Sequence, residues 1–174
     1  MASNTITTVW KENMVFESDN PSGETLFMDA PDEGIENKGL RPKALMLSSL
    51  AGCSGLDVVS LLKKMRAEVD DFKMVVHGEL TEEHPRYYHK VVIAYHFYGS
   101  DLQEDKINKA VKLSVDQYCG VMEMFRQFAK VTGRAKETQG PPGDPWTPQE
   151  DPGTTPGKPR DPPGTPQEDP GTTQ

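Results

Sequence analysis

Two cysteines are the residues of this chain with the most reactive side chains. Cys53 lies in the segment Leu-Ala-Gly-Cys-Ser-Gly-Leu, and Cys119 lies in Tyr-Cys-Gly-Val. A cysteine thiolate can attack the O–O bond of a hydroperoxide and become a sulfenic acid, and a second thiol can condense with that acid to form a disulfide. Free cysteines are also common as packing residues, because the thiol behaves as a small hydrophobe. The pair therefore indicates either thiol redox chemistry or ordinary core packing.

Small residues surround the first of these thiols. Gly52 and Gly55 flank Cys53 inside a segment that is otherwise apolar. Because a glycine inside a helix costs about 1 kcal/mol relative to alanine, two of them indicate that another group approaches the backbone closely. Asp57 follows one helical turn after Cys53. We expect this carboxylate to cap or to form hydrogen bonds in the core rather than to act as a base, since a nearby anion raises the pKa of a thiol.

The histidines predict no metal site. His77, His84, His89 and His96 are spread over a predicted hairpin, and the odd separation of the last two sends their side chains to opposite faces of a strand. The chain has neither a CxxC nor an HExxH motif, and it has no glycine-rich phosphate loop. We therefore expect no metal ion and no cofactor.

The elements that must position the first thiol follow from strand and helix patterns. Three short strands are predicted over residues 6–10, 14–18 and 25–29, followed by a polar loop. A helix is predicted to begin at Pro42, where the missing N–H costs nothing, and to end near Met65, where lysines suit a helix C-terminus. This helix carries Cys53.

Two longer strands are predicted next, over residues 72–80 and 87–97, because apolar side chains alternate with polar ones. Tyr87, Tyr95 and Phe97 are expected in the core. Two such strands joined by a short polar turn indicate an antiparallel hairpin.

A second helix is predicted to position the other thiol. Ser100 and Gln103 form a predicted capping box, and the apolar stripe that follows continues to Tyr118. Cys119 stands where that stripe ends, and residues 129–138 are expected to form a final edge strand. Helices that follow antiparallel hairpins indicate an α+β fold.

The composition limits the partners. The 174 residues carry a net charge of −8 without a basic stripe, so nucleic acid is not expected. The chain shows no basic segment followed by an apolar stretch near its start, and no uninterrupted apolar run of about 18 residues, so we expect neither a secretory signal nor a membrane span. Two cysteines then fit the reducing cytoplasm, where a disulfide is transient and catalytic.

The sequence predicts a folded domain over residues 1–139 and a tail over residues 140–174. The tail holds most of the 15 prolines and contains the segment Thr-Pro-Gln-Glu-Asp-Pro-Gly-Thr-Thr twice, at 147–155 and 165–173. Such a composition cannot bury enough apolar surface to fold, so we expect a disordered spacer or solubilising tail. A PxxP sequence within it also allows recognition by a proline-binding partner.

The helix beginning at Pro42 predicts a second copy of the chain as partner. Its apolar residues lie on nearly every side, as in a helix buried centrally rather than at a surface. A folded domain of residues 1–139 is too small to cover all of these sides by itself. We therefore expect a homodimer with this helix at its centre.

The surroundings of both cysteines resemble those of one known family. The segment Leu-Ala-Gly-Cys-Ser-Gly-Leu-Asp-Val-Val-Ser-Leu-Leu-Lys-Lys-Met, which contains Cys53, is similar to the first-cysteine helix of the OsmC/Ohr family. Tyr-Cys-Gly-Val around Cys119 resembles the family's second-cysteine segment. Residues 22–23 and 28–30 are similar to the N-terminal hairpin of the OsmC-like branch. The resemblance covers most of residues 5–138.

This resemblance implies an intertwined α+β homodimer, with antiparallel sheets around two central helices and active sites at the subunit interface. It also implies a peroxiredoxin-like enzyme that reduces organic hydroperoxides in oxidative-stress defence and is itself reduced by an external thiol. In that reaction Cys53 is the peroxidatic residue and Cys119 the resolving one.

Two family residues have no counterpart here. The family's glutamate after the helix-opening proline is replaced by Lys43-Ala44, and no arginine precedes Arg41. Arg41 or Lys43 of the partner subunit are therefore the candidate cations that activate the Cys53 thiol. The alternative is a catalytically weak OsmC-like protein that binds a small hydrophobic ligand near Gly52 and Gly55.

Overall fold

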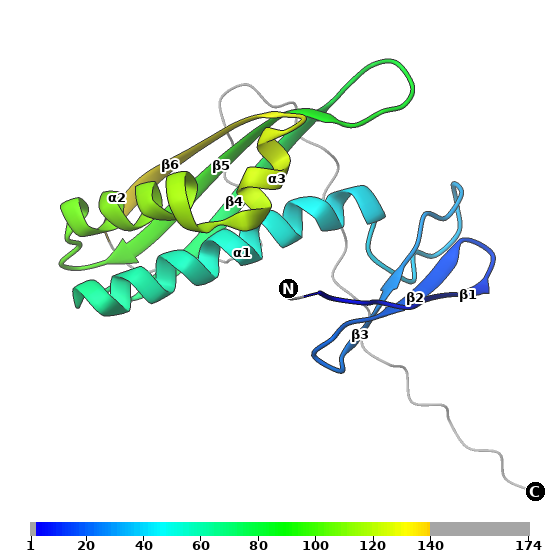
Figure 1. Ribbon diagram of the computed structural model, residues 1–174, viewed down its shortest axis with the longest axis horizontal. Helices are drawn as coiled ribbons and strands as arrows, with labels where there is room; N and C mark the ends of the chain where they lie inside the picture. Colours follow the sequence, from blue (N-terminus) through cyan, green and yellow to red (C-terminus); the bar gives the residue numbers. More distant parts are fainter. Residues whose placement is uncertain (1–2, 140–174) are drawn as a thin grey trace, which may run out of the picture. The chain divides into compact units, whose positions relative to one another are not determined.

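The computed structural model describes residues 3–139, and this part of the chain forms two three-stranded sheets and three α-helices (Figure 1). The α+β class predicted from the sequence is confirmed. The predicted tail, residues 140–174, lies outside the described residues.

The first sheet is antiparallel and is built from the N-terminal residues. β1 (Thr8–Glu12) pairs with β2 (Val15–Asp19), and β2 pairs with β3 (Thr25–Met28). Gly23, in the turn between β2 and β3, has a φ of +89°, which a residue with a side chain rarely adopts. The three predicted strands are confirmed, with bounds shifted by one or two residues.

α1 (Pro42–Met65) is the predicted helix that carries Cys53. Pro42 lies in the first turn of α1, and the helix ends at Arg66, which has a left-handed φ of 52°. The side chains of α1 that are buried within the chain are spaced four positions apart and form one narrow stripe: Leu50, Ser54, Val58 and Leu62. Other apolar side chains of α1 are exposed, and Leu56 reaches 75% exposure.

By length and composition alone, α1 is also the one helix among the described residues that could cross a membrane. No membrane span was expected from the sequence, because polar residues interrupt the apolar run, although the mean hydropathy of the helix stays high. The core helix of a soluble protein passes the same test, and α1 contributes three leucine and valine side chains to the core. Within the chain, 22% of the residues in the apolar window of α1 are buried, and the others are partly buried or exposed.

The second sheet has the order β4-β5-β6. β4 (Asp71–Leu80) pairs with β5 (Tyr88–Gly99) as the predicted antiparallel hairpin. β6 (Lys130–Gln139) is the predicted edge strand, but it runs parallel to β5. The expectation of antiparallel sheets is wrong for this pair, because the helices between β5 and β6 return the chain to the end of the sheet where β5 began.

Two helices and a turn of π-helix connect β5 with β6. α2 (Glu104–Leu113) begins after Gln103, which is the N-cap and makes no side-chain capping bond. The predicted capping box is therefore wrong, and acidic residues in the first turn of α2 complement the helix dipole instead. The predicted helical stripe continues as a π-helical turn, Ser114–Tyr118, and α3 (Gly120–Arg126) follows.

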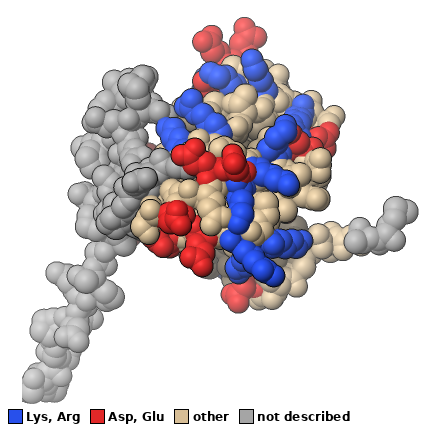
Figure 2. Space-filling view, turned by 90° about the vertical axis from the view of Figure 1, so that its left-hand side faces the viewer, with Lys and Arg blue, Asp and Glu red and all other residues tan. Residues whose placement is uncertain are grey.

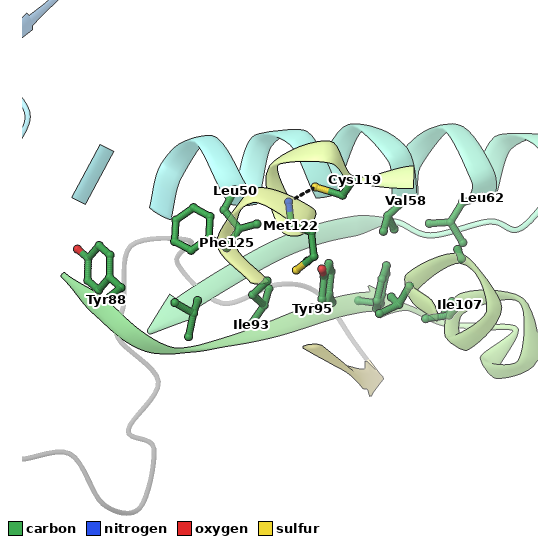
Figure 3. Close-up of a cluster of buried hydrophobic side chains, with 14 residues drawn as sticks. Leu50, Val58, Leu62, Tyr88, Ile93, Tyr95, Ile107, Cys119, Met122 and Phe125 are labelled. Atoms are coloured by element: carbon green, nitrogen blue, oxygen red, sulfur yellow. Dashed lines mark hydrogen bonds between the residues drawn. The ribbon is translucent and has the colours of Figure 1, made fainter. Parts of the chain in front are cut away.

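The core lies between the second sheet and the helices that cover one face of it (Figures 1 and 3). Tyr95 and Phe97 of β5 are fully buried there, as predicted. Tyr87 is 49% exposed, and its neighbour Tyr88 is buried in its place. The prediction for Tyr87 is wrong because the pairing with β4 shifts register after Glu79.

Charged side chains of both signs share the surface. Figure 2 shows basic and acidic side chains spread over one face of the molecule rather than gathered by sign. The ion pairs of Lys90 with Glu79 and of Lys112 with Asp116 are exposed, and such pairs stabilise a fold little. The apolar core is therefore the main source of stability.

Candidate active site

α1 presents Cys53 and Asp57 on one face, because residues four positions apart on a helix are neighbours. Both side chains are partly buried. Gly55 leaves room for Met74 of β4, whose Sδ lies 3.1 Å from where a Cβ would stand, so the predicted close approach is confirmed there. No atom lies within 4 Å of where a Cβ on Gly52 would stand, so the predicted close approach is wrong for Gly52.

The π-helical turn positions the second thiol. The backbone N–H of Cys119 donates to the carbonyl of Ser114, five residues earlier, at 3.0 Å. Cys119 then leaves the helical conformation and becomes the N-cap of α3, and its Sγ accepts a hydrogen bond from the Met122 N–H at 3.4 Å (Figure 3). The Cys119 side chain is 4% exposed. The predicted place of this thiol at an element boundary beside Gly120 is confirmed.

The two helical segments bring three reactive side chains together. The Sγ atoms of Cys53 and Cys119 and a carboxylate oxygen of Asp57 all lie within 4.8 Å of one another. Both cysteines are free thiols. The sequence indicated the two thiols as a pair, but it did not predict that the carboxylate lies beside both of them.

Buried hydroxyl groups form a hydrogen-bonded chain beside this cluster. Tyr95 Oη lies 2.6 Å from Ser54 Oγ, which lies 2.8 Å from Ser114 Oγ. The Ser114 hydroxyl has two acceptors within reach, the Ser54 carbonyl at 3.2 Å and Asp57 Oδ2 at 3.4 Å. When it donates to Asp57, Tyr95 can donate to Ser54 and Ser54 to Ser114, and every hydroxyl proton then points toward the carboxylate. The expectation that Asp57 forms hydrogen bonds within the core is thus confirmed.

Burial dominates the acid–base properties of the site. It raises the pKa of the Cys119 thiol to about 11; the Met122 N–H opposes the rise, while Cys53 and Asp57 add to it. Burial also raises the pKa of Tyr95 to about 12, and the hydrogen bond with Ser54 opposes this rise. Cys119 therefore keeps its proton at neutral pH.

The two candidate cations lie at the start of α1. Arg41 is the N-cap residue and Lys43 belongs to the first turn, and both are exposed. Lys43 precedes Cys53 by ten residues, which is about 15 Å along a continuous helix. Neither cation can therefore reach the thiol of its own chain while α1 is intact.

Sequence reasoning missed the hydroxyl chain and the position of the carboxylate. Ser54 and Ser114 look like ordinary small or polar helix residues, and Tyr95 was expected only to fill the core. The available signal was the spacing of Ser54 from Leu50 and Val58, which puts a polar group on the buried stripe of α1. A buried hydroxyl needs a partner, so this position indicated a polar contact.

The chain belongs to the OsmC-like protein family. The family model with that description matches residues 35–133, which contain both thiols and the whole of α1. The family-level expectation from the two cysteine contexts is thus confirmed.

Relatives with names and structures extend this result. Protein YhfA of Escherichia coli strain K12 is 32% identical over 123 residues, which cover 71% of this chain and 90% of that protein. The crystal structure of a hypothetical protein from Aquifex aeolicus VF5 superposes with a TM-score of 0.71 at 29% identity, covering 81% of this chain and 100% of that one. The organic hydroperoxide resistance protein OhrB of Bacillus subtilis shares the fold, with a TM-score of 0.57 at 16% identity and coverage of 78% and 98%.

Proposed function

We propose that this protein reduces organic hydroperoxides, with Cys53 as the attacking thiol and Cys119 as the resolving thiol. The observation that supports this assignment is the proximity of two free thiols in unequal surroundings. Cys53 is partly exposed, whereas Cys119 is buried and has a pKa raised to about 11. A hydroperoxide can approach the first thiol, whereas burial keeps the second thiol protonated.

The first step is the attack of the Cys53 thiolate on the terminal oxygen of the hydroperoxide. The O–O bond breaks, an S–O bond forms, and the alkoxide leaves and takes up a proton to become an alcohol. Cys53 is then a sulfenic acid. The sulfur is oxidised by two electrons, and the peroxide is reduced by the same two electrons.

In the second step the Cys119 sulfur attacks the Cys53 sulfenic acid, and water leaves as the disulfide forms. Cys119 must lose its proton in this step, and its raised pKa makes spontaneous ionisation rare at pH 7. The Asp57 carboxylate lies within 4.8 Å of both sulfurs and is positioned by Ser114. A small movement lets it accept the Cys119 proton, which then passes to the leaving hydroxide. The structure thus favours the role of a base for Asp57, which the sequence analysis did not expect.

The family supports a reaction of this class. The Bacillus subtilis protein of the same fold is described as an organic hydroperoxide resistance protein. The match at 16% identity carries only the fold, so the assignment of activity to this chain depends on its own thiols.

The proposal includes a homodimer with an activating cation from the second subunit. Leu56 and Val59 expose 75% and 37% of their surface on α1, and a second copy of α1 would cover them. Arg41 or Lys43 of the partner subunit would then approach the Cys53 thiol. Arg41 and Lys43 of the same chain cannot take this role, because the length of α1 separates them from Cys53.

The test mixes reduced full-length protein with cumene hydroperoxide. One hydroperoxide should be consumed for each pair of thiols, and mass spectrometry should find one disulfide between Cys53 and Cys119 within a chain. Cys53→Ser should consume no peroxide. Cys119→Ser should consume one equivalent and keep a sulfenic acid on Cys53 that dimedone traps.

The contrary results are equally specific. The proposed reaction would be refuted if thiols were lost without consumption of peroxide, or if the disulfide formed between two chains. Ser49→Cys serves as a control, because it adds an exposed thiol one turn before Cys53 without the second sulfur beside it. If that thiol alone, in a Cys53→Ser background, restores the wild-type rate, the geometry of the pair is not what matters.

A further inference from the structure

We propose that the reduced protein binds one zinc ion through Cys53, Cys119 and Asp57, and that zinc binding competes with disulfide formation. The proposal uses the side chains of the proposed redox site but does not depend on peroxidase activity. It departs from the expectation of no metal site drawn from the sequence. That expectation was based on the spacing of the histidines, whereas Cys53, Cys119 and Asp57 come together only in the fold.

The donor set selects the class of ion. Thiolate ligands favour zinc and softer ions over magnesium and calcium, which prefer oxygen ligands. Two sulfurs and one carboxylate make three protein ligands, which is the number typical of zinc sites that keep a fourth position for water or a substrate. Among the described residues, these three form the one group of histidine, cysteine and acidic side chains close enough together to hold an ion.

The separations fit tetrahedral coordination after a small adjustment. Zinc binds sulfur at about 2.3 Å, so two sulfurs of a tetrahedral site lie about 3.8 Å apart. The three donor atoms here are separated by no more than 4.8 Å. The two sulfurs therefore need to close by at most about 1 Å, and each sulfur–oxygen pair by slightly more because Zn–O bonds are shorter than Zn–S bonds. Small changes in side-chain torsion supply such movements. Because Cys53 and Asp57 share one face of α1, only Cys119 must approach from another element.

Neighbouring groups already orient two of the three ligands. Ser114 Oγ donates to Asp57 Oδ2, and the Met122 N–H donates to Cys119 Sγ. Hydrogen bonds of this kind from outside the ligand set hold ligands in place in metal sites and strengthen binding. The buried link from Ser114 through Ser54 to Tyr95 fixes the first of these donors. The cluster thus resembles a preformed site rather than an accidental approach of side chains.

The experiment titrates the reduced, metal-free full-length protein with zinc against a chromophoric zinc indicator. One zinc ion should bind per chain. Cys53→Ser, Cys119→Ser and Asp57→Asn should each weaken binding at least tenfold, whereas Asp105→Asn, which removes an exposed carboxylate of α2, should not change it. The disulfide form should not compete with the indicator.

A second measurement covers variants that fold poorly. Cadmium bound by thiolates gives an ultraviolet charge-transfer band, and its intensity should fall by about half in whichever cysteine variant remains folded by circular dichroism. Zinc bound with equal affinity by the disulfide form, or by the Cys119→Ser variant, would overturn the proposal, because the ion would then sit on surface groups. Magnesium should leave both signals unchanged.

The two proposals fail separately. If the protein binds zinc but consumes no peroxide in metal-free buffer, the metal site is supported and the proposed reaction is refuted. Peroxide consumption without zinc binding does the reverse. If both hold, zinc should slow disulfide formation in proportion to its occupancy, and a chelator should restore the rate.

Discussion

Replacing Asp57 by asparagine tests whether the carboxylate acts as a base or only disturbs the thiols. Two opposite effects are expected. Removing the negative charge lowers the pKa of Cys119, which favours its thiolate. The effect of this charge on the pKa is smaller than the effects of burial, the Met122 N–H and Cys53. Removing the base takes away the acceptor of the Cys119 proton. The two effects change the rate of disulfide formation in opposite directions. A slower rate in Asp57→Asn would therefore indicate that the carboxylate acts as a base, and a faster rate that it only raises the pKa of Cys119.

The magnitudes favour a loss. With a pKa of about 11, about one Cys119 thiol in 10,000 is ionised at pH 7. A positioned base contributes about 100-fold to 10,000-fold to a proton transfer, whereas lowering the pKa of Cys119 by one unit would accelerate the step only about tenfold. We therefore expect Asp57→Asn to slow the resolving step by at least about tenfold while leaving the attack by Cys53 in place.

The assay is a single turnover with one equivalent of cumene hydroperoxide, quenched with dimedone at increasing times. In Asp57→Asn the sulfenic acid on Cys53 should persist, and the rate of its conversion to disulfide should rise about tenfold per pH unit between pH 7 and 10, since it then follows the Cys119 thiolate fraction. In the wild type this slope should be much shallower. Asp105→Asn should behave as the wild type. Equal slopes, or faster resolution in Asp57→Asn, would refute the role of base.

The remaining predictions concern stability and assembly. Ser54→Ala should cost about 1–3 kcal/mol in urea unfolding, because it leaves the Tyr95 hydroxyl buried without a partner, and adding Tyr95→Phe should cost little more; fully additive losses would contradict the hydroxyl chain. The pKa of Cys119 is raised by burial from 9.0 to about 11, so its contribution to stability is complete below pH 9 and is lost as the pH rises through 11. Between pH 9 and 11 the wild type should lose roughly 2 kcal/mol relative to Cys119→Ser, and a constant difference between the two proteins would show that burial does not hold the proton. Leu56→Glu should dissociate the proposed dimer in analytical ultracentrifugation, and a monomeric wild type at micromolar concentration would remove the dimer altogether.

The sequence predicted the local elements well because their causes are local. Pro42 and the two lysines before Met65 mark the ends of α1, and the alternation of apolar residues marks β5. The errors have tertiary causes. Gln103 rather than Ser100 precedes α2, and the direction of β6 depends on how the helices before it pack.

The candidate site was half predictable for the same reason. Cys53 and Cys119 are reactive residue types, so the sequence alone identifies them. Asp57 gains its role only because the π-helical turn before Cys119 ends the helix where that thiol faces α1. A π-helical turn has no composition signal of its own, and such insertions are frequent at functional sites. The convergence of the three side chains was therefore beyond the reach of periodicity and spacing.

The unequal surroundings of the two thiols determine the order of the proposed reaction. Cys119 is buried, and Cys53 and Asp57 both add to the rise of its pKa, so it is a poor first nucleophile at neutral pH. It becomes reactive when a sulfenic acid forms beside it and the carboxylate takes its proton. Under this scheme the partly exposed Cys53 must attack the hydroperoxide first, whichever cation assists it. Dimedone added during turnover should label Cys53, and label found on Cys119 would reverse the assignment.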